Sequence, residues 1–587
     1  MMTESNNPIL ITTTTVSAPG KILLAGGYLV LESPNVGIVL AVDKKFYSTV
    51  KVVDTNNNTT STTNNTINTA NNNEHAKVTS NNNNNNTTRI VVHSPQFGAT
   101  WNYQAITTTS TTSKDTNVVA VQLTADPSNT STNSFVEKTL RVSMTYLMSS
   151  FYNDNNNNAA AAAAFPPPTQ LDITILADND FYSVVPHLKA RQWKATTENL
   201  QRLPKFLPCS SGGGGGGGES GTLQKTGLGS SAALVTSLVG ALVLSFQKLQ
   251  DRITLDTTTT TSSNMDPVTR RKIHNLAQVC HCHAQGKVGS GFDVSSASYG
   301  SHIYQRFPKC LLADLLAELD KQEVDTSLLS SSSSSSSSSL SPSNVQILQQ
   351  LVDENPEQFQ WPIVQRPLSW NTQLLQIMLA DVSGGSESPS MARKVLHWKV
   401  TAEDKSCWTN LAHLNERVAK LCDDIVQSLE DCNANRIAEM TQALSQCKLD
   451  EATWTANKNN STSIDESTHK TGKLVCDLRR TLTETRENLK RMGDLAQVPV
   501  EPDEQTNLAN ATMELPGVVA SLVPGAGGYD AMVVVYVNTT QVRDHICHLW
   551  TNYKPLAVCP LAVQFAPYGD GLAIESETPE YYQPNTS

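Results

Sequence analysis

The most continuous apolar stretch of the chain, residues 234–246, follows directly on a short segment with two glycines and two serines. That segment is Lys225-Thr226-Gly227-Leu228-Gly229-Ser230-Ser231-Ala232-Ala233. The glycines let the backbone turn tightly and approach a ligand, and the serines suit the start of a helix through the apolar stretch. The first N–H groups of such a helix have no intrahelical acceptors and favour an anion. With the charge of Lys225 and the hydroxyls of Ser230 and Ser231 beside them, the pattern predicts a loop that binds a polyphosphate.

Other apolar patterns predict the secondary structure around this loop. Continuous or alternating apolar runs predict strands at 37–42, 90–93, 99–103, 171–176, 303–307 and 374–381. Apolar residues at helical spacing predict helices at 135–151, 266–285, 408–429, 435–444 and 474–492. Residues 518–536 indicate another glycine-rich loop that runs into a strand, and polar residues predict loops at 107–112, 382–390 and 454–467.

Low-complexity tracts of Asn, Thr, Ala, Pro, Gly and Ser interrupt these elements. They hold few apolar residues, so burial cannot offset the entropy of ordering them. We expect disordered insertions at 54–89, 104–116, 153–168, 209–221 and 256–264. A serine-rich stretch at 326–345 is the expected linker between an N-terminal domain, residues 1–325, and a C-terminal domain, residues 346–587.

Composition narrows the classes of function. The net charge of −11 argues against a general binder of nucleic acid or anionic membranes, although it allows a local basic pocket. The 11 cysteines have no repeating spacing, so reduced thiols are expected. Residues 1–15 lack the basic start of a secretory signal, and the apolar run at 232–246, about 15 residues, is too short to span a membrane.

These features predict a soluble protein of the cytoplasm, with the peroxisome as the alternative. Its expected partners are small molecules, with no nucleic acid and no membrane. The sequence leaves a monomer and a homodimer open.

Other interpretations of the glycine-rich segment fit less well. Residues 227–232 match the loose G-x-G-x-x-A dinucleotide pattern, but a glycine tract at 212–218 precedes them where a strand should be. The P-loop pattern G-x-x-x-x-G-K-[ST] is absent from the sequence, which disfavours a P-loop kinase. A metal site at Cys280-His281-Cys282-His283 is disfavoured because consecutive residues on a helix point around its circumference. For the segment taken alone, a capped buried helix with nothing bound stays open.

Glycine-rich segments recur in order at 19–28, 225–233 and 524–530, and their conjunction is more specific than any one of them. The set resembles the motifs of the GHMP kinase superfamily, whose second motif cradles the phosphates of ATP. More narrowly, residues 18–32, 225–232, 285–294 and 523–531 look like the fungal and plant type of phosphomevalonate kinase. Residues 385–391 resemble a further Gly/Ser loop of that family, with Glu387 where a small or hydroxyl residue is expected.

The resemblance implies an α+β, two-domain GHMP kinase fold. Its N-terminal domain would hold the ATP cradle, and its C-terminal domain would place helices on an antiparallel sheet. It further implies transfer of the γ-phosphoryl group of ATP, in the presence of Mg²⁺, onto the phosphate of 5-phosphomevalonate, a step of isoprenoid and sterol biosynthesis. The alternatives are another small-molecule kinase of the superfamily, such as mevalonate kinase, or a non-catalytic ATP-binding regulator. The presence of Lys21, Lys225 and Asp293 disfavours the regulator.

The matched motifs also imply site residues. Lys21, Lys225 and Asp293 are the candidate catalytic residues, and Ser230 or Ser231 would bind Mg²⁺. The residues implied to bind ATP are Lys225, Thr226, Gly227, Leu228, Gly229, Ser230, Ser231 and Ala232. Those implied to bind the second substrate are Lys21, Gly26, Tyr28, Ser290, Gly291, Asp293, Gly525, Gly527 and Gly528.

Asp293 matches an aspartate that related alcohol kinases use as a general base. A phosphate monoester has a second pKa of about 6, so its oxygen is already largely deprotonated near neutral pH. We therefore expect Asp293 to orient Lys21 or the substrate, with the base role as the alternative.

Overall fold

The computed structural model describes residues 9–54, 87–111, 117–156, 168–209, 224–254, 265–328, 340–354, 361, 364–382, 388–460, 465–529 and 531–581. The central parts of the predicted insertions and of the serine-rich linker lie outside these residues, as do Glu387 and Asp530. All 11 cysteines are free thiols, as expected.

The N-terminal lobe is built on a large sheet whose strands follow the order β14-β1-β2-β6-β3-β4-β5, with β13 and β7 also paired to β2 and β8 paired to β7. The pairings are antiparallel except for β3 with β6, which is parallel. The strands are β1 (Ile9–Ala25), β2 (Val36–Asp54), β3 (Thr87–Ser94), β4 (Ala99–Thr111), β5 (Asn117–Ala125), β6 (Gln170–Ala177), β7 (His302–Gln305), β8 (Val364–Pro367), β13 (Phe565–Ala566) and β14 (Ala573–Ile574).

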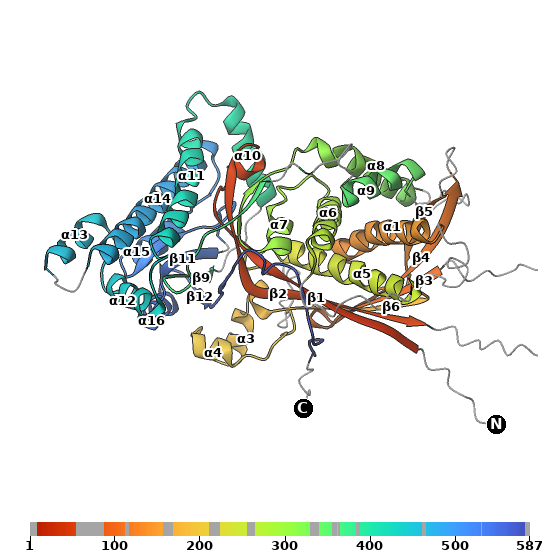
Figure 1. The fold of residues 1–587 in the computed structure, drawn as a ribbon, viewed down its shortest axis with the longest axis horizontal. Helices are drawn as coiled ribbons and strands as arrows, with labels where there is room; N and C mark the ends of the chain where they lie inside the picture. Colours follow the sequence, from red (N-terminus) through yellow and green to blue (C-terminus); the bar gives the residue numbers. More distant parts are fainter. Residues whose placement is uncertain are drawn as a thin grey trace, which may run out of the picture.

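Helices α1 and α5 cover one face of this sheet, and α6 packs against both of these helices (Figure 1). The helices of this lobe are α1 (Ser134–Asn156), α5 (Ser230–Thr254), α6 (Pro267–Ala284), α7 (Phe292–Tyr299), α8 (Cys310–Leu328) and α9 (Pro342–Asp353). Shorter turns are η1 (Leu29–Leu31), η3 (Pro95–Phe97), η4 (Asn179–Phe181), α3 (Val185–Ala190) and α4 (Thr197–Gln201). The apolar run read from the sequence becomes α5, so the helix expected behind the glycine loop is confirmed.

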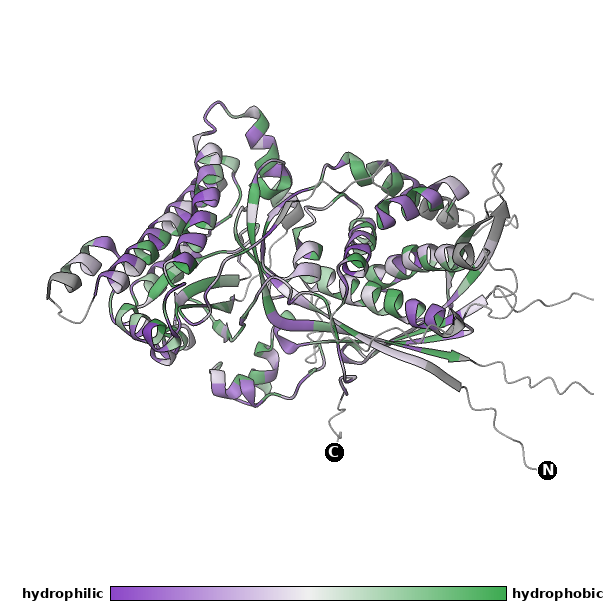
Figure 2. Ribbon diagram, in the orientation of Figure 1, coloured by the Kyte–Doolittle hydropathy of each residue, from purple (hydrophilic) through white to green (hydrophobic). Residues whose placement is uncertain are grey.

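The C-terminal lobe holds a smaller, fully antiparallel sheet in the order β10-β11-β9-β12. Its strands are β9 (Leu375–Val382), β10 (Val518–Leu522), β11 (Ala531–Val537) and β12 (Val558–Leu561). Its helices are α10 (Ser388–Thr401), α11 (Ser406–Gln427), α12 (Ala434–Ser445), α13 (Glu451–Asn460), α14 (Glu466–Ala496), α15 (Asp503–Met513) and α16 (Thr540–Thr551). Figure 2 shows hydrophilic and hydrophobic residues mixed along α11 and α14, as expected where a helix turns one face to a core.

Several boundaries differ from those predicted. Residues 54, 87–89 and 104–111, expected in disordered insertions, are strand, because they pair with neighbouring strands of the large sheet. Residues 153–156, also expected to be disordered, are the last turn of α1. Residues 454–460, expected in a polar loop, belong to α13, where Trp454 is 2% exposed and anchors the helix. Residues 388–390, also expected in a loop, begin α10.

The predicted linker and domain boundary also differ from the structure. Residues 326–328 end α8 and residues 342–345 begin α9, which packs against α6 and α1 of the N-terminal lobe. Strands β8, β13 and β14 then return to the first sheet from beyond residue 346. The chain therefore crosses between the lobes more than once, and the lobes are not two consecutive segments.

Helix α5 is longer than the apolar run of about 15 residues read from the sequence. By length and composition, Ser230–Asp251 could cross a membrane, yet 83% of its most apolar stretch of 18 residues is buried inside the protein. The core helix of a globular lobe meets the same criterion, and α5 lies against β1 and β2.

Candidate functional site

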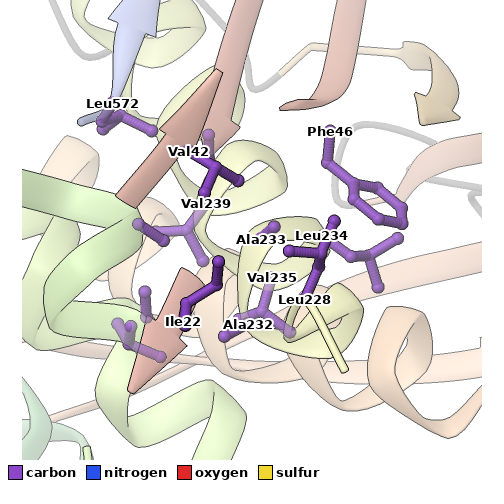
Figure 3. Close-up of a cluster of buried hydrophobic side chains, with 14 of the residues drawn as sticks. Ile22, Val42, Phe46, Leu228, Ala232, Ala233, Leu234, Val235, Val239 and Leu572 are labelled. Atoms are coloured by element: carbon purple, nitrogen blue, oxygen red, sulfur yellow. The ribbon is translucent and has the colours of Figure 1, made fainter. Parts of the chain in front are cut away.

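The loop at residues 225–231, here called the phosphate loop, is fixed by its backbone conformation and by an apolar anchor. Gly227 and Gly229 have φ values of +81° and +75°, a left-handed conformation that suits glycine. Between them, Leu228 is 1% exposed and packs with Ala232 of α5 in the apolar cluster that Figure 3 shows. The centre of the loop is therefore held to the core of the N-terminal lobe.

Polar contacts hold the beginning of the phosphate loop. Thr226 is fully buried, its Oγ1 donates to the carbonyl of Asp180 at 2.5 Å, and its N–H donates to that of Phe181 at 3.3 Å. Because its hydroxyl is used inside the protein, Thr226 shapes the loop rather than presenting a side chain to a ligand. Lys225 is exposed and pairs with Tyr182 only through the backbone.

Lys21, near the end of β1, lies across the phosphate loop. Its backbone N–H donates to the carbonyl of Leu228 at 2.9 Å, and its Nζ donates to that of Gly227 at 3.3 Å. A Cβ added to Gly229 would come within 2.9 Å of the Lys21 Cε, so this glycine leaves the room that the lysine side chain occupies. The Lys21 ammonium also stands 5.3 Å from the ring centre of Phe292, which precedes Asp293.

His281 of α6 lies beside the phosphate loop and feels the charge of Asp293. Its Nε2 lies 3.1 Å from the Ser231 Oγ and 3.2 Å from the Gln285 Nε2. Burial lowers the pKa of His281 to about 4, opposed by the charge of Asp293 and supported by that of Lys21. The imidazole is therefore neutral near pH 7. Because an amide nitrogen can only donate, Nε2 is the acceptor, and the Ser231 hydroxyl donates to it.

Sequence reasoning missed this role of His281. It weighed the Cys280–His283 run only as a metal site. Within the described parts of the chain, no group of three or more His, Cys, Asp and Glu side chains could hold a metal ion. One signal was present in the sequence: the helix predicted at 266–285 leads directly into the segment that carries Asp293, so its last turns had to lie beside the site.

Residues 286–293, here called the Asp293 loop, lead into α7. Gly291 caps this helix with a φ of +85°, and Asp293 lies in its first turn. The Asp293 Oδ1 is buried and has no hydrogen-bond partner among the residues that the structure describes. Ser290 is half-buried just before the cap. A buried carboxylate oxygen without a partner is costly, which is typical of a functional position.

The first glycine-rich segment is shaped by close backbone approach. At Gly26, with a φ of +114°, a Cβ would come within 2.6 Å of the Gly37 Cα, so no other side chain fits. Tyr28 is 2% exposed, and its hydroxyl donates to the carbonyl of Ala526. The Tyr28 side chain therefore joins the first glycine segment to the third and is not itself free for a ligand.

The third glycine-rich segment contains two structural glycines and one open glycine. A Cβ at Gly527 would clash with the Val500 carbonyl at 2.1 Å, and the Gly528 N–H donates to the same carbonyl at 3.0 Å. Gly525 has a φ of +70°, its N–H donates to the carbonyl of Leu23 at 3.1 Å, and a Cβ there would meet nothing within 4 Å. Gly525 therefore has open space beside it, whereas Gly527 does not.

A cavity of about 160 Å³ adjoins the phosphate loop. Aromatic side chains form much of its wall, and Lys225, Ser230 and Ser231 line it at the loop; the aromatic residues are Phe46, Phe97, Trp101, Phe135 and Tyr182. Phe97 and Tyr182 meet edge to face, with ring centres 5.6 Å apart. Such walls suit a flat heteroaromatic ring whose phosphates reach the loop.

The structure thus divides the predicted catalytic residues between two sides of the phosphate loop. Ser231 is hydrogen-bonded to His281, and the charges of Lys21 and Asp293 both act on the His281 imidazole. Lys225 lies at the aromatic cavity, which Ser230 and Ser231 also line. A cation from each side can therefore face phosphate groups bound on the loop.

No family model matches the chain. Among curated proteins, a phosphomevalonate kinase of Aspergillus fumigatus is 32% identical over 556 residues, which cover 94% of this chain and 92% of that protein. A phosphomevalonate kinase of Arabidopsis thaliana, named peroxisomal, is 29% identical and covers 96% of both chains. A solved structure of Streptococcus pneumoniae phosphomevalonate kinase in complex with phosphomevalonate and AMPPNP is 12% identical, with a TM-score of 0.41 over 95% of this chain and 100% of that one.

Proposed function

The chain belongs to the phosphomevalonate kinase family, and from this premise we propose that it transfers the γ-phosphoryl group of ATP to the phosphate of 5-phosphomevalonate. The products are 5-diphosphomevalonate and ADP. The observation that carries the proposal is the 32% identity over 94% of the chain. The contacts of Lys21 with the phosphate loop and with the Phe292 ring beside Asp293 support it, because phosphoryl transfer needs cations and fixed dipoles around the transferred group.

For ATP, we propose that the phosphates lie along the phosphate loop and that the base enters the aromatic cavity. The N–H groups at the start of α5 favour anions, and Lys225 adds a charge where the loop and the cavity meet. Phe97, Trp101 and Tyr182 offer faces and edges for the flat base.

Lys21 and Lys225 are proposed to bind the transferring phosphoryl group. Two anionic phosphates must approach each other, so the reaction depends on cations that neutralise their repulsion. Lys21 contacts the phosphate loop and stands over the Phe292 ring of the Asp293 loop, which supports a role for it in binding both the donor and the acceptor. Lys225 approaches from the cavity side.

The residues at the loop fit Mg²⁺ carried by ATP. Mg²⁺ keeps several waters and takes few protein ligands, so a site without a cluster of carboxylates suits it when phosphates supply the remaining ligands. We propose that Ser231 holds it rather than Ser230. The Ser231 proton is donated to His281, which leaves the oxygen lone pairs for a cation. When bound, Mg²⁺ neutralises negative charge on the phosphates.

Asp293 is proposed to orient Lys21 or the substrate rather than to act as a base. The acceptor phosphate has a second pKa of about 6, so its nucleophilic oxygen is largely deprotonated at pH 7. Asp293→Asn should therefore lower kcat about equally across pH 6 to 9. Turnover that is lost below the pKa of the substrate and spared above it would instead establish a general base.

The first experiment incubates the protein with Mg²⁺-ATP and, separately, 5-phosphomevalonate, mevalonate and galactose. ADP release and product mass are followed together. Turnover only with 5-phosphomevalonate, with a diphosphate product, is the expected result. Turnover with mevalonate would make this a mevalonate kinase, and ATP binding without turnover on any acceptor would make it a regulator.

We infer a cytoplasmic enzyme, with the peroxisome as the alternative because the Arabidopsis thaliana relative is named peroxisomal. Cell fractionation of the full chain distinguishes the two compartments. Sedimentation of the purified chain distinguishes the proposed monomer from the homodimer.

A further inference from the structure

A buried arginine joins the first glycine-rich segment to the Asp293 loop. Arg306 follows β7 and is 2% exposed. Its Nη1 donates to the carbonyl of Leu31 at 2.7 Å, and its Nη2 donates to that of Val288 at 2.9 Å and to that of Gly289. Its guanidinium group therefore links the turn that follows Tyr28 to the loop that carries Asp293.

Two further buried side chains hold the next carbonyls of the same loop. The Tyr304 hydroxyl donates to the carbonyl of Ser290 at 2.9 Å, and the Gln278 Nε2 donates to that of Gly291 at 2.7 Å. A Cβ at Gly291 would come within 2.6 Å of the Tyr304 hydroxyl. The carbonyl side of the Asp293 loop thus packs directly on these buried polar groups.

This arrangement orients the N–H groups of the loop. In a trans peptide, the carbonyl of one residue and the N–H of the next point in opposite directions. The N–H groups of Ser290, Gly291 and Phe292 therefore point away from the buried side chains. In the described parts of the chain, none of these three has an acceptor. Backbone N–H groups arranged in this way are suited to bind an anion.

Arg306 has no carboxylate partner among the described residues. Burial lowers its pKa, opposed by the neighbouring Tyr304. A buried cation held only by carbonyls costs free energy in folding, so stability alone does not explain its use at this position.

We propose that Arg306, Tyr304 and Gln278 are positioning residues of the kinase: by holding the carbonyls of residues 288–291, they turn the amide groups of Ser290, Gly291 and Phe292 toward the acceptor phosphate. This inference rests on the proposed function for the identity of the acceptor. It assigns the three side chains to the binding of the acceptor and not to the binding of ATP.

The mildest test is Tyr304→Phe, which removes the hydroxyl that holds Ser290. We expect KM for 5-phosphomevalonate to rise about tenfold while KM for ATP stays within about twofold. The matched control is Tyr146→Phe, which removes a partly buried hydroxyl hydrogen bond of 2.7 Å from α1 to Asp353 of α9 in the same lobe. Equal rises in both KM values, or none, would overturn the proposal.

A second pair of variants separates the shape of the guanidinium from its charge. Arg306→Lys keeps the positive charge but cannot reach three carbonyls at once. Arg306→Met removes the charge and all the hydrogen-bond donors of the side chain. KM for 5-phosphomevalonate should rise in both variants, and further in Arg306→Met. If Arg306→Lys behaves as wild type, the planar guanidinium group with its several donors is not needed, and the proposal is wrong.

The hydrogen bonds from Arg306, Tyr304 and Gln278 to the carbonyls of residues 288–291 are here called the clamp. Amide hydrogen exchange tests the clamp without any substrate. The Ser295 N–H donates to the carbonyl of Gly291 at 3.0 Å, at the start of α7. Loosening of the Asp293 loop in Tyr304→Phe should speed exchange at Ser295, while the first turn of α5 stays as in wild type. Unchanged exchange at Ser295 would overturn the clamp. If the wild-type protein phosphorylates another acceptor, only the proposed function is wrong. The same variants then test the clamp through KM for that acceptor.

Discussion

The phosphate loop and the Asp293 loop lie on either side of Lys21, and they are held by different means. The phosphate loop is anchored by Leu228 in the apolar core and continues into an apolar helix. The Asp293 loop rests on buried polar side chains, chiefly Arg306 and Tyr304.

This difference follows from what each loop has to do. A loop that binds phosphates with its own N–H groups and the start of a helix needs mainly a stable platform. Non-directional apolar packing at Leu228 provides most of it, and Thr226 adds hydrogen bonds at the beginning of the loop. A loop that presents particular amide groups to an acceptor needs each peptide plane fixed, and hydrogen bonds supply that direction. The variants below test this contrast, beginning with the residue that the two loops share.

The largest effect is expected from Lys21→Met. Its ammonium contacts the Gly227 carbonyl and stands over the Phe292 ring, so it serves both loops. We expect kcat to fall by about 10³ or more, because the loss of a cation at the transferring phosphoryl removes stabilisation specific to the transition state. The control is Lys51→Met, which changes an exposed lysine on β2. A fall in kcat of less than about tenfold would exclude a catalytic role for Lys21.

The next effect concerns the apolar anchor. Leu228→Ala removes a side chain that is 1% exposed and should lower the free energy of unfolding by about 2–4 kcal/mol. Chemical denaturation measures this loss. Because Leu228 also places the backbone of the phosphate loop, KM for ATP should rise more than KM for 5-phosphomevalonate. The opposite order of the two KM values would show that the loops are not held independently.

A smaller effect should separate the two serines at the start of α5. Ser231→Ala should weaken the binding of Mn²⁺ to the ADP complex about tenfold, and Ser230→Ala about twofold or less. Electron paramagnetic resonance of free Mn²⁺ measures both affinities without turnover. Ser230 should matter less because its hydroxyl is hydrogen-bonded to Tyr182 on the cavity side. A larger loss in Ser230→Ala would move the metal to that serine.

The sequence predicted the phosphate loop better than the Asp293 loop, for a physical reason. α5 and its glycines form a local pattern, since the apolar residues that anchor them follow within one helix. The side chains that hold the Asp293 loop come from α6 and from beyond α7, and no local pattern records their contacts. His281 was missed for the same reason.

The prediction of strands and helices from the sequence is limited in the same way. The strands β2, β6, β9 and β11 were recognised from continuous apolar runs. Strands β13 and β14 have two residues each, too few for any periodicity, and only their pairing with β2 and β1 defines them. α13 was missed because its polar composition is typical of a loop, whereas a single buried Trp454 anchors it on Gly472.

The smallest effect is expected at the turn formed by residues 178–180, which contains two aspartates and contacts the phosphate loop. Thr226 is bonded to the carbonyl of Asp180, and burial raises the pKa of the neighbouring Asp178 to about 6, partly opposed by the Lys45 N–H that donates to it. The ordinary pKa of an Asp is about 4. Because the pKa in the folded protein is the higher one, the stabilising contribution of Asp178 is complete below about pH 4 and is lost as the pH rises through about 6.

Asp178→Asn replaces the carboxylate with a neutral group that can still accept from the Lys45 N–H. The stability of the variant relative to wild type should therefore increase by about 1 kcal/mol between pH 5 and pH 8. Denaturation at both pH values measures it, with the exposed Asp494→Asn as a control that should show no such trend. Because burial also raises the pKa of Asp180, the pH dependence of stability should be reduced and not abolished. A relative stability that falls with pH would mean that the charged form of Asp178 supports the turn, and the phosphate loop would then depend on polar contacts more than on its apolar anchor.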